Sequence, residues 1–141
     1  MIHRIARSLL YLWALPTTLA SVPFLLTATF DGQIRSVDGV LEIHGRFTSF
    51  FLSRIVGLTL SGGAKAMTLG HVVLGLNQSA LDQTRRHERV HVRQCEIFGP
   101  FFLPAYLLSS LLLLLMRRDP YRQNPFERQA FAVEDASNKL Q

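Results

Sequence analysis

The chain has 141 residues, of which 48% are hydrophobic, and it carries a formal net charge of +5. This length predicts one domain with a modest core. Arginines flank the apolar blocks and are not interleaved with aromatic residues in a binding stripe. The charge pattern therefore argues against a nucleic-acid partner and indicates charge at the edge of a membrane. The single cysteine, Cys95, excludes an intramolecular disulfide.

The first apolar block runs from residue 8 to residue 30 without a charge, after a short basic start. A run of this length can span a bilayer, and Pro16 and Pro23 are tolerated in membrane helices. Residues 1–30 therefore predict a membrane anchor. Two alternatives stay open, a signal peptide cleaved near Ala20 or a helix buried in the core. An anchor with this charge pattern predicts a cytoplasmic amino terminus and a remaining chain on the non-cytoplasmic side.

A small sheet is expected after this block. Residues 40–44 alternate apolar and polar side chains, which predicts a strand, and Asp31-Gly32 and Asp38-Gly39 are typical turn pairs. Residues 46–55 favour a short helix, and residues 61–63 a loop.

Residues 67–76 are rich in β-branched and aliphatic side chains and predict one further strand. His71, within this strand, is a second histidine that could reach a metal, or else an ordinary strand residue. A strand at this point of the chain could also accept a substrate peptide by pairing along its edge.

The sequence Ser79-Ala80-Leu81-Asp82 has the form of a capping box and predicts a helix that begins near Ala80 and continues to Phe98. His87 and His91 lie in its interior, one turn apart on one face, so both imidazoles can bind the same zinc ion. Glu88 would then lie beside the metal, where a general base is needed. Gln94 shares this face and is a candidate for orienting a ligand.

A catalytic zinc site usually has a third protein ligand. Glu96 is on the wrong face of the helix, whereas Asn124-Pro125 predicts the start of a new helix with Glu127 in its first turn. Residue type and position leave two roles open for Glu127, a metal ligand or a carboxylate that caps the helix. Glu134 and Asp135 are the reserve candidates.

The motif His87-Glu88-x-x-His91-x-x-Gln94, followed by Asn124-Pro125-Phe126-Glu127-x-x-Ala130, resembles the small gluzincin-type HExxH zinc metallopeptidases, in particular short bacterial members. The similarity covers roughly residues 66–135. It implies an α+β, mainly helical, minimal zincin-like domain over residues 31–141, with a small β-sheet behind an amino-terminal hydrophobic helix.

The same resemblance implies Zn²⁺ as cofactor, His87, His91 and Glu127 as its ligands, Glu88 as general base, and a peptide or protein substrate. The chain has no clear match for the residue that stabilises the transition state in larger members. Candidates for contact with the oxyanion are Tyr121, Tyr106, His71 and Arg122.

A second apolar block, residues 97–116, lies between the expected ligands. If it spanned a membrane, His91 and Glu127 would lie on opposite sides. Gly99-Pro100 and Pro104 interrupt its early part, so we predict a helix over residues 105–116 that packs behind the zinc helix or lies in the bilayer surface. Two alternatives are a non-catalytic membrane protein with a structural zinc and a two-span membrane protein with a fortuitous HExxH.

Overall fold

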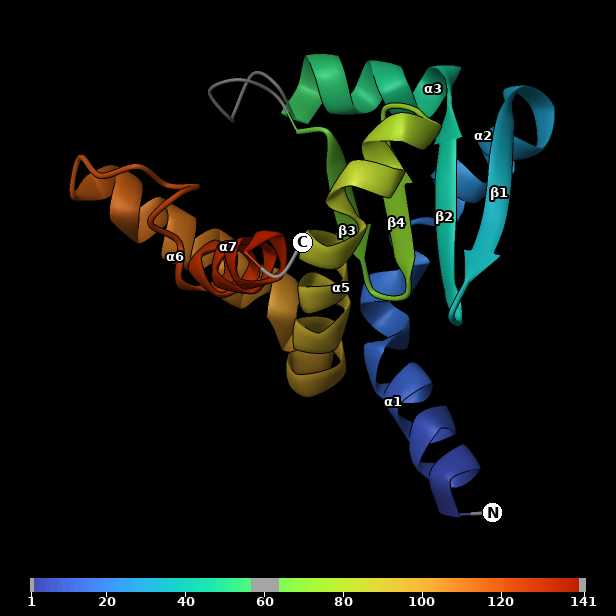
Figure 1. Cartoon of the computed structure of the whole chain (residues 1–141), viewed down its shortest axis with the longest axis horizontal. Coiled ribbons are helices and arrows are strands. Elements are labelled where there is room, and N and C mark those ends of the chain that lie inside the picture. The colour runs from blue at the N-terminus through green and yellow to red at the C-terminus, as the bar shows by residue number, and fades with distance from the viewer. Residues whose placement is uncertain (1, 57–63, 140–141) are drawn as a thin grey trace.

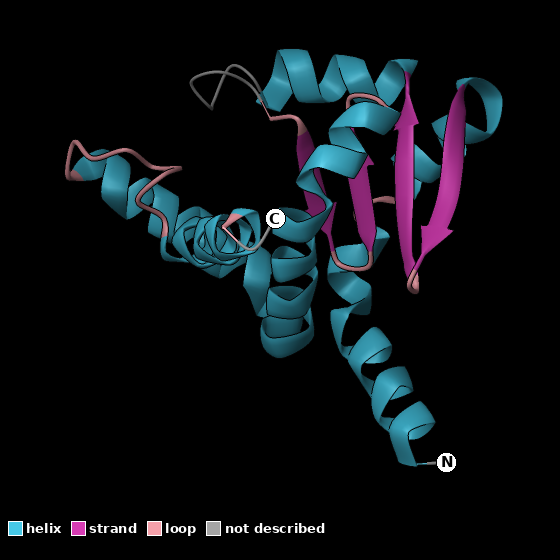
Figure 2. Cartoon of the chain, viewed as in Figure 1, coloured by secondary structure: helices cyan, strands magenta, loops and turns pink. Residues whose placement is uncertain are grey.

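The computed structural model describes residues 2–56 and 64–139, and it confirms an α+β fold that is mostly helical (Figure 2). The loop expected at 61–63 lies outside the described residues. The elements in chain order are α1 (Ile2–Leu19), α2 (Val22–Asp31), β1 (Gly32–Val37), β2 (Val40–Gly45), α3 (Arg46–Phe50), the π-helical turn η1 (Phe51–Val56), β3 (Ala66–Leu69), β4 (Val72–Gly75), α5 (Gln78–Phe98), the 3-10 turn η2 (Gly99–Phe101), α6 (Phe102–Leu115) and α7 (Pro125–Asn138).

The four strands form one mixed sheet in the order β1-β2-β4-β3. Strands β1 and β2 pair antiparallel, β2 and β4 pair parallel, and β4 and β3 pair antiparallel. The turn predicted at Asp38-Gly39 joins β1 to β2, with φ angles of 49° and 81°, the left-handed values that a tight hairpin turn requires. The prediction of a turn at Asp31-Gly32 is wrong, because Asp31 ends α2 and Gly32 begins β1.

The single strand expected over residues 67–76 is wrong, because the structure has a hairpin there. Gly70 adopts φ +63° and ends β3, so the chain reverses before β4 begins. A side chain at Gly70 would collide with Thr18 of α1, so glycine is needed both for the turn and for the close approach of α1. As a result, His71 lies in the turn and not within a strand.

The amino-terminal apolar run is divided into two helices and not continuous. Over the described side chains, α1 and α2 meet at an angle of 75°. Phe24 and Ala28 of α2 are buried in a core cluster with Ile43 of β2 and Leu74 of β4. The alternative of a helix buried in the core therefore fits α2, which is the second part of the apolar run. The membrane anchor over residues 1–30 stays a prediction.

Helix α5 covers the opposite face of the sheet, where Leu81 and Val92 pack on Val40 and Val73 (Figure 1). It begins at Gln78, earlier than the capping box predicted. Its cap is Asn77, whose side-chain oxygen accepts a hydrogen bond from the backbone nitrogen of Ala80 at 2.9 Å. The rest of the expected helix is confirmed and ends at Phe98.

The chain turns between α5 and α6 at Gly99, which has φ +55° and closely approaches the indole of Trp13. Helix α6 then begins at Phe102, ahead of the predicted residue 105. Among the described residues, the helical segment Gln78–Leu115 is long and apolar enough to cross a membrane, and only 11% of its apolar window is buried. The bent pair Ser8–Leu19 and Val22–Asp31 passes the same test of length and composition if the two helices are taken as one span.

Candidate metal centre

Two helices bring three ligand-type side chains together. His87 and His91 project from the same face of α5, and Glu127 reaches them from the first turn of α7. Their nearest ligand atoms all lie within 4.8 Å of one another, and the three residues are 6%, 6% and 3% exposed. Helix α7 begins at Pro125 with Asn124 as its cap, as the sequence predicts, since the Asn124 side chain accepts from the Phe126 backbone nitrogen at 3.0 Å.

The distances between these atoms are short. Nε2 of His87 lies 3.0 Å from Oε2 of Glu127 and 3.2 Å from Nε2 of His91. Nε2 of His91 lies 3.4 Å from Oε1 of Glu127. A bilayer therefore cannot separate His91 from Glu127, and the second apolar block does not place them on opposite sides.

The orientation of the His91 ring follows from Gln94. The Gln94 amide nitrogen donates to the Phe126 carbonyl at 3.0 Å and to Oε1 of Gln129 at 2.8 Å. Because the nitrogen has two acceptors, the amide oxygen must face Nδ1 of His91, 2.9 Å away, and accept its proton. Neutral His91 then carries no proton on Nε2, and this nitrogen presents a lone pair to the cluster.

The ring of His87 is held in a similar way by Glu134, whose Oε2 lies 3.3 Å from Nδ1. A carboxylate accepts only, so Nδ1 of His87 is the donor. With both rings neutral and protonated on Nδ1, two imidazole lone pairs and a carboxylate therefore converge at one buried point. That arrangement is repulsive without a positive charge, and its donor set fits a divalent cation held by His87, His91 and Glu127.

The pKa shifts of Glu127, His87 and His91 also indicate that positive charge is favoured at this point. When Nε2 of His87 and of His91 carries a proton, it donates to Glu127. Burial raises the pKa of Glu127, but these hydrogen bonds outweigh it and hold the pKa at about 2. Burial lowers the pKa of His87 and of His91, and the hydrogen bonds to Glu127 reverse this, so both pKa values lie above 6.5. A proton and a metal ion therefore compete for the same nitrogen atoms.

Glu88 is buried next to the cluster at 5% exposure, and Thr68 of β3 holds its carboxylate. The Thr68 hydroxyl donates to Oε2 of Glu88 at 2.7 Å. Burial raises the pKa of Glu88 above 4.5, although the hydrogen bond from Thr68 opposes the shift. A carboxylate of raised basicity beside a metal cluster suits the acceptance and release of a proton.

Tyr106 of α6 contacts the other oxygen of Glu127. Its hydroxyl donates to Oε1 of Glu127 at 2.7 Å, and burial, followed by the charge of Glu127, raises the Tyr106 pKa far above its usual range. The Asn124 side chain donates to the Tyr106 carbonyl at 3.1 Å and to the Ser110 hydroxyl at 2.8 Å. The cap of α7 is thereby tied to α6, which fixes Glu127 from both sides.

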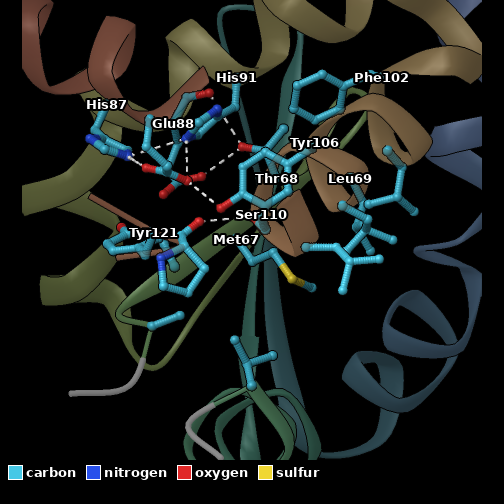
Figure 3. Close-up of a pocket in the computed structure, with 18 of the residues that line it drawn as sticks. Met67, Thr68, Leu69, His87, Glu88, His91, Phe102, Tyr106, Ser110 and Tyr121 are labelled. Carbon is cyan, nitrogen blue, oxygen red and sulfur yellow. Dashed lines mark hydrogen bonds and ion pairs between the residues drawn. The ribbon is translucent and has the colours of Figure 1, made fainter. Parts of the chain in front are cut away.

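The cluster lies at one end of a cavity of about 400 Å³ (Figure 3). Figure 3 shows His87, Glu88 and His91 gathered with Thr68 and Tyr106, while Met67 and Leu69 line the space beyond them. Further lining comes from all four residues of β3, from Tyr121, and from leucines of α6. The polar groups are thus concentrated at one end of a mainly apolar space.

The structure brings some sequence candidates together and not others. Gln94, Tyr106 and Tyr121 lie at the cluster or in the cavity wall, and the reserve residue Glu134 contacts His87. His71 instead pairs with Glu96 at 3.2 Å and stacks on the Tyr11 ring, with centroids 3.9 Å apart, outside the cavity lining.

Arg122 is also outside the lining, with its guanidinium 6.0 Å from the centroid of the Phe131 ring. Two arginines of α5 likewise point away from the cluster, since Arg85 pairs with Glu42 at 2.7 Å and Arg89 donates to the Val37 carbonyl at 2.6 Å. No local pattern in the sequence indicates Thr68, because its role arises from the packing of β3 against α5.

No protein-family model, curated protein sequence or solved structure matches this chain. The buried group of His87, His91 and Glu127 therefore stands on its geometry, as a group that could hold a metal ion.

Proposed function

We propose that this protein is a zinc-dependent peptidase, with His87, His91 and Glu127 as metal ligands and Glu88 as general base. The observation that carries the proposal is the convergence of two imidazole lone pairs and one carboxylate beside a second, buried carboxylate. A structural zinc site is usually closed by four protein ligands, whereas three ligands leave a position for water or substrate.

Zinc is the metal that this donor set favours, because two histidine nitrogens and one glutamate oxygen are a ligand set of catalytic zinc. When bound, zinc would supply Lewis acidity to a substrate carbonyl and to a water molecule. Gln94 and Glu134 hold the two imidazole rings with their Nε2 atoms toward the site, and Tyr106 holds Glu127. Such contacts fix tautomer and ring orientation before any ligand arrives.

Glu88 performs the proton transfers of the proposed reaction. Its carboxylate accepts the proton of the attacking water and delivers it to the amine that leaves. The raised pKa makes the carboxylate a stronger base, and the Thr68 hydroxyl holds one of its oxygens in place. The chain's own contribution is therefore a prepositioned base whose side chain is buried.

The outer strand β3 is suited to bind an extended substrate. It pairs with β4 on one side and stands last in the sheet order, and its residues line the cavity. An extended peptide could therefore add to this edge through backbone hydrogen bonds and present one peptide bond to Glu88. Tyr121 lines the same space, whereas His71 and Arg122 do not, and the Tyr106 hydroxyl is bound to Glu127. Tyr121 is therefore the best-placed of these four candidates for contact with the oxyanion.

The test is the variant Glu88→Gln, which keeps the shape of the side chain and removes its basicity. Purified wild-type protein loaded with zinc should hydrolyse a quenched-fluorescence peptide library, and Glu88→Gln should lose at least about 100-fold in rate while it keeps its zinc. The matched control is Glu96→Gln on the same helix, which should retain activity because Glu96 lies outside the cavity lining. Equal hydrolysis by Glu88→Gln would refute the assignment. Stoichiometric zinc without hydrolysis by the wild type would instead establish a structural metal.

A further inference from the structure

The outer surface of α6 and of the turn before it is apolar and uncovered. We define the apolar face as six residues that are each between 51% and 71% exposed: Phe101, Leu107, Leu108, Leu111, Leu112 and Leu115. Large side chains at this exposure are common singly, but a contiguous group marks an interaction site. In Figure 1, α6 extends to the left of α5, α1 runs downward, and the sheet lies at the upper right.

We propose that the apolar face lies in the surface of a lipid bilayer and that the cavity opens onto it, so that the substrates are apolar polypeptide segments held at the membrane. The substrate part rests on the proposed peptidase function, whereas the docking part does not.

The composition of the face favours lipid over a protein partner. No charged residue occurs between residues 97 and 116, and the run ends at the exposed pair Arg117-Arg118. Protein interfaces surround an apolar centre with polar residues, whereas an apolar segment flanked by arginines matches acyl chains and the anionic headgroups beside them. The most apolar window of this segment is only 11% buried within the chain.

Three polar side chains near the face have partners inside the protein, as a lipid environment demands. The Ser110 hydroxyl donates to the Pro120 carbonyl at 2.9 Å, and the Thr17 hydroxyl donates to the Gly99 carbonyl at 3.2 Å. The indole nitrogen of Trp13 donates to the Ile97 carbonyl at 3.3 Å. Insertion of this region into lipid would therefore leave these donors satisfied.

The length of α6 determines how it meets the bilayer. Its 14 residues cover about 21 Å at about 1.5 Å per residue, which is short of the roughly 30 Å hydrocarbon core. Glu127 also lies beside His87 on the same side, so α6 does not carry the chain across. The helix therefore lies along the surface of one leaflet, as one of the alternatives for residues 97–116 expected.

The cavity and the apolar face share Leu107 and Leu111, which line the cavity although they are 57% and 51% exposed. Leu114 of the same helix also lines the cavity and is 59% exposed. The cavity wall thus continues outward onto the face along these leucines. An apolar segment that leaves the lipid at α6 could pass along these leucines to Glu88 without exposure to water, which selects aliphatic side chains presented at a membrane.

Trp13 is the single tryptophan of the chain, and it contacts the face at Phe101, with ring centroids 6.3 Å apart. Its fluorescence therefore reports docking without a label. The variant Leu108→Gln/Leu112→Gln/Leu115→Gln alters the face and spares the cavity, because none of the three lines it. The control is Ile34→Gln, which changes an exposed side chain on β1.

Vesicles of phosphatidylcholine and phosphatidylglycerol, with and without bromine on the acyl chains, are the probe. Brominated lipid should quench Trp13 in the wild type, in Ile34→Gln and in Glu88→Gln, and the triple variant should bind vesicles about tenfold or more weakly. Unquenched Trp13 in the wild type, or equal binding by the triple variant, overturns docking. Self-association in the absence of lipid that the triple variant abolishes, together with no vesicle binding, assigns the face to a second copy and also overturns it.

The substrate arm compares one apolar peptide in two forms, free in solution and tethered to the vesicles by an acyl chain. Wild type should cleave the tethered form about tenfold faster or more, and the triple variant should lose this preference while it cleaves the free form equally. Cleavage of the free form without vesicle binding defeats docking and leaves the peptidase. Binding without any cleavage defeats the peptidase and leaves docking.

Discussion

Oε1 of Gln94 lies 2.9 Å from Nδ1 of His91, and this contact determines which nitrogen of the imidazole faces Glu127. Gln94 is fixed in turn by the Phe126 carbonyl and by Gln129, both on α7. One side chain therefore sets the tautomer of a ligand on α5 and joins that helix to the one that carries the third ligand. The same Gln94 contacts therefore orient a metal ligand and hold α5 against α7.

Gln94→Leu should weaken zinc binding about 10- to 100-fold, because His91 loses the acceptor that holds its ring. Competition with a chromogenic chelator measures the affinity. Gln83→Leu, on an exposed part of the same helix, is the control and should bind zinc as the wild type does. An unchanged affinity in Gln94→Leu would show that the ring is held by other contacts.

Thr68→Val should lower the rate of hydrolysis and move the acid limb of its pH profile. The Thr68 hydrogen bond lowers the pKa of Glu88, whose burial raises it. Removal of the bond raises the pKa further, so Glu88 becomes protonated at a higher pH and the rate falls earlier on acidification. Thr84→Val, which removes only a bond to the Ala80 carbonyl within α5, should leave the limb in place. If the acid limb shifted equally in Thr68→Val and Thr84→Val, the hydrogen bond from Thr68 would not be what sets the pKa of Glu88.

Tyr106→Phe should reduce zinc affinity about 10- to 100-fold, since a hydrogen bond to a charged carboxylate is worth about 1.5–3 kcal/mol. The variant removes the donor that holds Oε1 of Glu127 and leaves the ring in the cavity wall. Titration calorimetry on the wild type, Tyr106→Phe and the distant control Tyr11→Phe compares the three affinities. Equal affinities would assign Tyr106 to packing alone.

Zinc affinity should rise with pH through the range above 6.5. The folded-state pKa values of His87 and His91 are raised, because hydrogen bonds to Glu127 outweigh burial, so protons hold the nitrogen sites up to a higher pH than in a free imidazole. Metal binding must displace them, and affinity is lost as the pH falls through these raised values. Glu127, with a pKa of about 2, contributes no proton in this range. Calorimetry in two buffers of different ionisation enthalpy should reveal proton release; the absence of release near neutral pH would contradict the two raised values.

The sequence predicts the parts of the molecule that depend on local rules. The helix that carries His87 and His91, the turn at Asp38-Gly39, and the Asn124-Pro125 start of α7 follow from periodicity, turn residues and capping. Each signal lies within a few residues of the feature that it predicts, so no tertiary information is needed.

The remaining features depend on contacts between distant segments. The reversal at Gly70 reflects the approach of Thr18, which lies on another helix, so the run 67–76 looks like one strand by composition. Thr68, and the role of Glu134, become visible only when β3 and α7 pack on α5. The first apolar run is likewise divided where Phe24 becomes buried against the sheet, and a hydropathy profile carries no information about that tertiary contact.

The most direct test of the metal centre is the zinc content of three purified proteins, measured by mass spectrometry after dialysis against trace zinc. Wild type and Asp135→Asn should each retain one zinc per chain, because Asp135 is exposed on α7 and lies outside the cluster. Glu127→Gln should retain much less, since a neutral amide replaces the buried carboxylate that faces both imidazoles. A wild type without stoichiometric zinc, or a Glu127→Gln protein with undiminished zinc, would contradict the centre described above.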